Sequence, residues 1–139
     1  MHWLSLAFVA IASTATTCGV SIQCEVSGSI PDGVSIRVEV PYAKKPPLTV
    51  HRIAIGELHG DEVWVLEGKS RLLDGLTYGE SVPGLKAKVG PHPLKPDTRY
   101  YVSISGETAR WPAQTGYGTC TFGTRSGKVF SPVPIEPAA

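Results

Sequence analysis

The sequence predicts an all-β protein, a single antiparallel β-sandwich of about seven or eight short strands. Apolar and polar residues alternate along most of the chain, and no window keeps apolar residues at helical spacing. The 15 glycines and 12 prolines are spread between the apolar runs, where they supply the turns that short strands need. A chain of 139 residues is long enough for one domain with its own core.

The individual strands follow from this alternation. Val34, Ile36 and Val38 alternate with polar residues and predict a half-buried strand, which Pro41 ends. The turn His59-Gly60-Asp61 predicts a hairpin tip. The expected strands cover residues 20–26, 34–40, 48–58, 62–66, 85–89, 94–105, 117–124 and 128–131. The strand at 85–89 is expected at a sheet edge, with Lys86 and Lys88 on its open face, and residues 72–78 are ambiguous.

The strongest local pattern is the spacing of Leu94, Pro96, Thr98, Tyr100 and Val102. It resembles the turn and strand that carry the tyrosine corner of fibronectin type III and immunoglobulin-like domains. The resemblance covers residues 94–104. It implies a β-sandwich in which the Tyr100 hydroxyl bonds to backbone near the turn while the ring packs in the core.

The N-terminus predicts export. Residues 3–12 form an apolar run that is too short to cross a bilayer but suits a secretory signal peptide, and Ala10-Ile11-Ala12 offers a small-x-small cleavage site. A buried first strand is the alternative. We therefore expect a signal peptide at 1–17, a β-sandwich domain at 18–131 and a flexible Pro-rich tail at 132–139, in a protein exported to the periplasm, outer envelope or extracellular space.

Cys18 gives a sharper version of this prediction. The stretch Ala15-Thr16-Thr17-Cys18 resembles the lipobox of bacterial lipoproteins, a resemblance that implies lipidation of Cys18 and a membrane-anchored protein. Simple cleavage without lipidation is the alternative.

The three cysteines are Cys18, Cys24 and Cys120. Lipidation of Cys18 would leave Cys24 and Cys120 as a pair, and an oxidising compartment would allow them to form a disulfide. The alternative is two buried free thiols that behave as small hydrophobic residues.

Charge and motifs exclude several classes of function. Thirteen Lys and Arg against twelve Asp and Glu give a net charge of +1, which argues against a nucleic-acid partner. The sequence has no zinc-ligand spacing, nucleophile elbow, phosphate loop or calcium loop. We therefore predict no catalytic residue, no metal ligand and no cofactor, and membrane contact only through an anchor at Cys18.

A possible binding surface is formed by Trp111, Arg110 and Tyr117, because exposed aromatic residues beside Arg stack on sugars or anchor protein contacts. Packing of Trp111 over the end of the core is the alternative. These residues favour a non-catalytic envelope or extracellular binding domain whose partner is a protein or a glycan. A carbohydrate-binding module is the second hypothesis, and a small enzyme with a site assembled from distant loops is the third.

Overall fold

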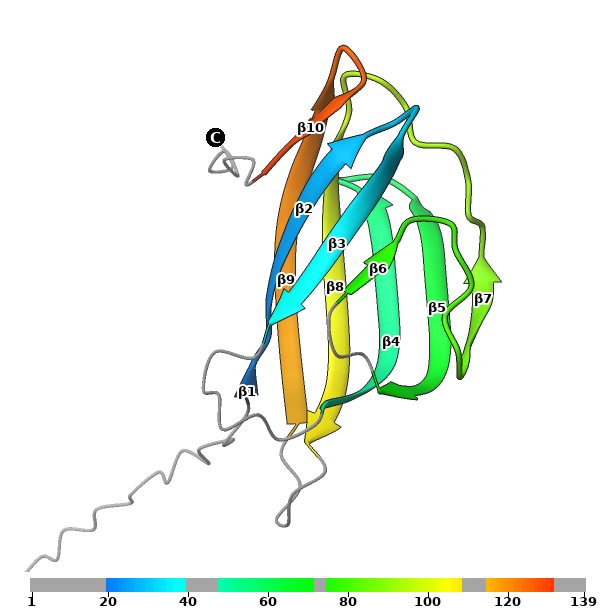
Figure 1. The fold of residues 1–139 in the computed structure, drawn as a ribbon, viewed down its shortest axis with the longest axis vertical. Helices are drawn as coiled ribbons and strands as arrows, with labels where there is room; N and C mark the ends of the chain where they lie inside the picture. Colours follow the sequence, from blue (N-terminus) through cyan, green and yellow to red (C-terminus); the bar gives the residue numbers. More distant parts are fainter. Residues whose placement is uncertain (1–19, 40–47, 72–74, 109–114, 132–139) are drawn as a thin grey trace, which may run out of the picture.

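The structure is a computed structural model that describes residues 20–39, 48–71, 75–108 and 115–131 (Figure 1). These residues form ten strands and no helix, so the predicted all-β class is confirmed. The strands are β1 Val20–Ser21, β2 Gln23–Ser29, β3 Gly33–Glu39, β4 Leu48–Glu57, β5 Glu62–Arg71, β6 Gly75–Thr77, β7 Leu85–Val89, β8 Arg99–Thr108, β9 Thr115–Arg125 and β10 Lys128–Phe130. Two very short strands, β1 and β6, account for most of the excess over the predicted number, because two or three residues are too few to show an alternating pattern.

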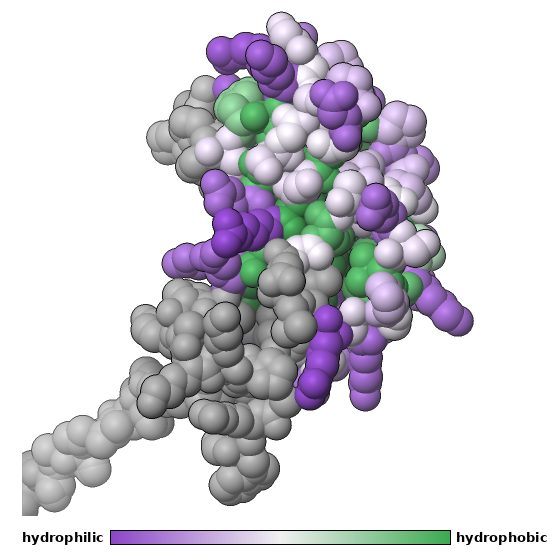
Figure 2. Space-filling model, viewed as in Figure 1, coloured by the Kyte–Doolittle hydropathy of each residue, from purple (hydrophilic) through white to green (hydrophobic). Residues whose placement is uncertain are grey.

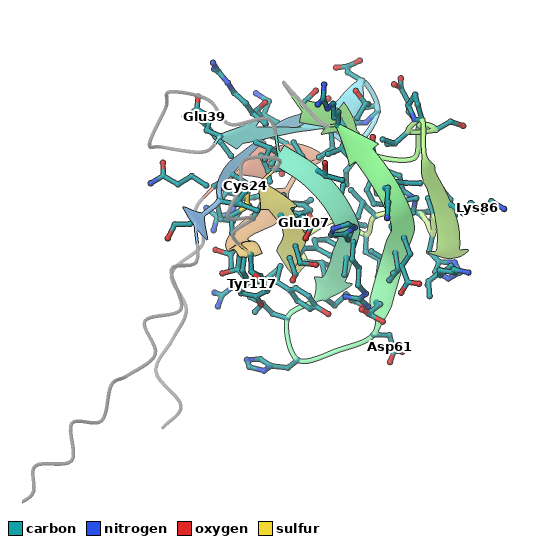
Figure 3. The ribbon with its side chains drawn as sticks, turned by 90° about the horizontal axis from the view of Figure 1, so that it is seen from below. Cys24, Glu39, Asp61, Lys86, Glu107 and Tyr117 are labelled. Carbon is teal, nitrogen blue, oxygen red and sulfur yellow. A yellow bond between two sulfur atoms is a disulfide. The ribbon has the colours of Figure 1, made fainter. Side chains whose placement is uncertain are left out.

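The strands follow one hydrogen-bonded path in the order β6-β3-β2-β10-β9-β8-β4-β5-β7, and β1 pairs with β9 in parallel. Seen from below in Figure 3, this sheet curls into a half-barrel. The predicted two-sheet sandwich is not confirmed. The reason lies in β10, which pairs with β9 on one side and with β2 through Lys128 and Ser29 on the other, so that hydrogen bonding continues from one arm of the curl to the other.

The core lies inside the curl. Strands β2 and β3 form one arm and contribute Val26 and Ile36, while the other arm, from β9 to β5, contributes Trp64, Tyr100 and Phe122. All five are at most 3% exposed and belong to one apolar cluster. The alternation in β3 places Val34, Ile36 and Val38 inward, as the sequence predicts.

Tyr78 helps to close the open side of the curl, between the edge strands β6 and β7. Its backbone N–H donates to Val34, its ring contacts Trp64 edge-to-face at 4.9 Å, and its hydroxyl donates to the carbonyl of His92. Burial, with a smaller effect from Tyr100, raises the pKa of Tyr78 from 10.0 to about 12. Figure 2 shows apolar surface in the middle of this face of the molecule, among polar side chains.

Tyr100 has the structural role that the tyrosine-corner resemblance implies. The side chain is fully buried, its ring stacks on Phe122 at 5.1 Å between centroids, and its hydroxyl accepts a 2.7 Å hydrogen bond from the backbone N–H of Lys95. This bond ties the turn before β8 to the core. The wider resemblance to fibronectin type III and immunoglobulin-like domains stays a prediction.

The predicted disulfide is present. Cys24 in β2 is bonded to Cys120 in β9, with 5.8 Å between the Cα atoms and a sequence separation of 96. Both residues pack against the core cluster, so the bridge joins the two arms of the curl.

Several predictions fall outside the described residues. The signal peptide, Cys18, Arg110 and Trp111 lie there, as does the tail at 132–139. Within the described ranges, no helix is long and apolar enough to cross a membrane.

Candidate functional site

The outer face of the curled sheet carries the candidate site. We define it by the side chains that point away from the core on β4, β5, β8, β9 and β10, which follow from the strand register and the contacts described below. They are His51, Arg52, Glu62, Glu67, Arg99, Tyr101, Ser103, Ser105, Glu107, Tyr117, Thr119, Thr121, Arg125, Lys128 and Phe130. On β8, for example, Tyr100, Val102 and Ile104 are buried inside the curl, so the residues between them face outward.

Two large hydrophobic side chains are exposed in the described part of the chain, and both belong to the outer face. Tyr117 is 58% exposed and Phe130 is 38% exposed. Tyr117 was predicted from the sequence as part of a binding surface, and the structure places it at the start of β9 beside β1. Phe130 was not predicted as part of a binding surface, because its position depends on the pairing of β10 with β9, which sets Phe130 opposite Gly123.

Glycines opposite two aromatic residues let their rings lie against the sheet. A Cβ atom added to Gly56 would lie 2.7 Å from the ring of Tyr101, and one added to Gly123 would lie 2.5 Å from the ring of Phe130. The ring ends of Tyr101 and Phe130 therefore occupy space on the outer face that a side chain at Gly56 or Gly123 would fill. Glycine inside a strand is a signal of close approach, and this signal was available in the sequence.

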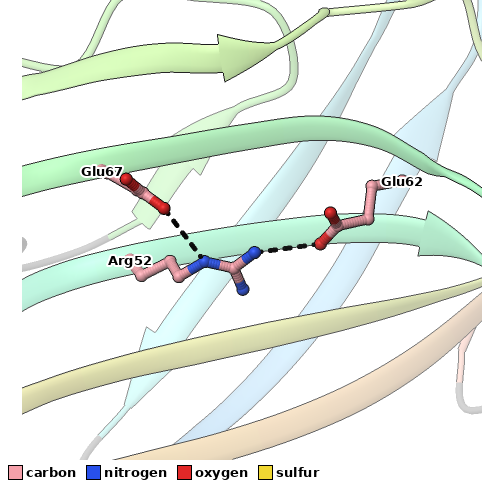
Figure 4. Close-up of polar contacts among 3 residues, drawn as sticks. All are labelled: Arg52, Glu62 and Glu67. Carbon is pink, nitrogen blue, oxygen red and sulfur yellow. Dashed lines mark hydrogen bonds and ion pairs between the residues drawn. The ribbon is translucent and has the colours of Figure 1, made fainter.

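Carboxylates lie beside the basic side chains Arg52 and His51 of β4. Arg52 lies between Glu62, at 3.1 Å, and Glu67, at 3.4 Å (Figure 4). His51 places Nε2 3.3 Å from Glu107 and Nδ1 3.4 Å from the carbonyl oxygen of Gly68. Such partly exposed pairs contribute about 0–1 kcal/mol each, so their main effect is to fix side-chain positions on the outer face.

The histidines give no reactive cluster. His59 lies at the β4–β5 hairpin tip with φ 61°, the left-handed conformation of a turn, which matches the predicted hairpin. The described residues include no group of three or more His, Cys, Asp or Glu that could hold a metal ion. The expected absence of catalytic, metal and cofactor sites stays a prediction.

Comparison of the chain with protein-family models, with curated proteins and with solved structures finds no match. A function therefore has to be argued from the outer face itself.

Proposed function

We propose that this chain is an exported, non-catalytic domain that binds another macromolecule through its outer face. The observation that carries the proposal is the position of Tyr117 and Phe130, the two exposed large hydrophobic residues of the described ranges, on one side of one sheet. Exposed aromatic side chains mark contact surfaces, because they offer a large apolar area at a low cost in side-chain entropy.

Export is supported by the Cys24–Cys120 disulfide, which suits an oxidising compartment. The proposal includes a signal peptide at 1–17 and lipidation at Cys18. Mass spectrometry of the mature N-terminus tests both. An acylated Cys18 as first residue supports the lipid anchor, whereas an unmodified Cys18, or a start at another residue, would end that part of the proposal.

The same proposal treats the two arms as the layers of a β-sandwich of the fibronectin type III or immunoglobulin-like kind. Their shared core and the Tyr100–Lys95 corner support this reading. An experimental structure in which β10 leaves β2, so that the path divides into two sheets, would support it further. Hydrogen exchange in solution that shows stable protection at the Lys128–Ser29 pairing of β10 with β2 would count against it.

Binding is tested by sedimentation of the mature protein with insoluble envelope material from its source. The double variant Tyr117→Ala, Phe130→Ala should bind about 30-fold to 1000-fold more weakly, since buried aromatic anchors contribute roughly 1–2 kcal/mol each and therefore about 2–4 kcal/mol together. The control is Glu25→Ala, Lys86→Ala, which changes exposed residues of β2 and β7. Equal binding by the double variant and the wild type would refute a role for the outer face.

A carbohydrate-binding module is the second candidate, and it is favoured by the rings seated on glycines. Aromatic rings on a sheet face are groups on which the C–H face of a sugar ring stacks. On a glycan array, Gly56→Ala should reduce binding, because the new methyl group displaces the Tyr101 ring from its seat. The matched control is Gly60→Ala at the hairpin tip. An array that binds no glycan removes this candidate.

A further inference from the structure

One end of the outer face carries a layered aromatic and cationic patch, which we call the Phe130 patch and define as Arg125, Lys128 and Phe130. The ring of Phe130 lies over Gly123, and the guanidinium carbon of Arg125 lies 5.3 Å from the ring centroid. Lys128 pairs with Arg125 across the β9–β10 hairpin and therefore points to the same side of the sheet. All three side chains are exposed.

The charges of this patch differ from those on β4. Arg52 and His51 each contact a carboxylate, whereas Arg125 and Lys128 make no ion pair within the part of the chain that the structure describes. The cation–π contact restrains the Arg125 guanidinium before any ligand arrives, which reduces the entropy lost on binding. A restrained guanidinium beside an ammonium group is suited to an anionic partner.

We propose that the Phe130 patch binds carboxylate groups of an acidic polysaccharide; this inference rests on the proposed binding function of the outer face. The argument is charge complementarity combined with the neighbouring ring of Tyr101. From the strand spacings, the Cα atoms of Phe130 and Tyr101 lie about 12 Å apart. A uronate polymer presents both apolar C–H faces and regularly spaced carboxylates, so one chain can contact the rings and the cations together.

The position of the patch argues against a membrane headgroup as the anion. Val20 pairs with Gly116, and Arg125 lies at the other end of the same strand. The nine-residue separation corresponds to about 30 Å. If Cys18 carries the proposed anchor, the patch is then several Debye lengths, of about 8 Å each, from the end of the sheet where the anchored chain enters. The acidic groups of a polymer beyond the membrane surface fit this placement.

The experiment is isothermal titration of the mature protein with polygalacturonate, alginate and hyaluronate. At least one should bind, and its affinity should fall as salt rises from about 50 mM to about 500 mM, because salt screens exposed charges. Arg125→Gln should weaken binding about tenfold, the size expected for loss of a charge-assisted contact. Lys128→Gln is a second variant should Arg125→Gln fail to fold. The matched control, Lys86→Gln on β7, should change nothing.

Two further titrations and the set of uronate polymers as a whole can each overturn the inference. Fully methyl-esterified polygalacturonate has the same backbone without charge, and equal binding to it would show that the cations are not used. Equal binding to poly-L-glutamate, lost in Arg125→Gln, would identify an acidic polypeptide as the partner instead. Binding to none of the three uronate polymers would also refute the inference. If envelope binding still depends on Tyr117 in that case, the proposed function stands without it.

Discussion

The Cys24–Cys120 bridge should supply a large share of the stability of this domain. It closes a loop with a sequence separation of 96, and the chain-entropy relation gives such a loop about 4.7 kcal/mol at 25 °C. Total unfolding free energies of single domains are about 5–15 kcal/mol. An unfolding entropy of about 2.1 cal/mol/K per residue, over about 110 residues, makes 1 kcal/mol equivalent to about 4 °C. The double variant Cys24→Ala, Cys120→Ala should therefore melt about 20 °C lower.

Differential scanning calorimetry of the mature protein tests this value. Reductant should lower the midpoint of the wild type by a similar amount and leave that of the double variant unchanged, which controls for other effects of the reductant. The reasoning is refuted if the wild-type midpoint falls by less than about 5 °C in reductant and also lies less than about 5 °C above the midpoint of the double variant. It would mean that the arms are held by the core and by the β10 link, without help from the bridge.

Three further predictions concern tyrosines. Tyr100→Phe removes the acceptor of the Lys95 N–H, so urea denaturation should show a loss of about 1–3 kcal/mol; an unchanged midpoint would contradict the corner. Gly56→Ala should lower the free energy of unfolding by about 1–3 kcal/mol, because the new methyl group overpacks against Tyr101. The loss should be smaller in a Tyr101→Ala background, and an equal loss in both backgrounds would exclude that contact. Folding raises the pKa of Tyr78 from 10.0 to about 12. Its protonated hydroxyl therefore contributes to the free energy of unfolding below pH 10, and this contribution is lost as pH rises through 12. Tyr78→Phe should melt with a weaker dependence on pH in this window.

Much of the fold was predictable where each pattern is local. Alternation identified β3, and the edge position of β7 with exposed Lys86 and Lys88 is confirmed. The tyrosine corner and the cysteine pair were also predictable, the first from a short spacing and the second from counting. These features depend on a few neighbouring residues or on covalent chemistry.

The remaining features depend on contacts between distant segments. Residues 63–66 are buried on both faces of β5, since Val65, at 2% exposed, lies on the outer face beside Ala54 of β4 and is covered there. Alternation alone predicts that one of these faces meets water. The continuous path through β10 depends on a pairing between Lys128 and Ser29, which no local pattern encodes. The contacts of the Tyr101 and Phe130 rings with Gly56 and Gly123 also depend on strand register, which no local pattern encodes.

The other surfaces of the described residues are less suited to binding a partner than the outer face is. The inside of the curl is filled by core side chains such as Trp64 and Phe122, and Tyr78 spans part of its open side. The β7 edge carries Lys86, which points outward in Figure 3, and Lys88. Lysines on an edge strand disfavour the addition of another strand. The outer face instead carries the exposed rings of Tyr117 and Phe130, with the cations Arg125 and Lys128 beside Phe130. It is therefore the described surface best suited to a partner.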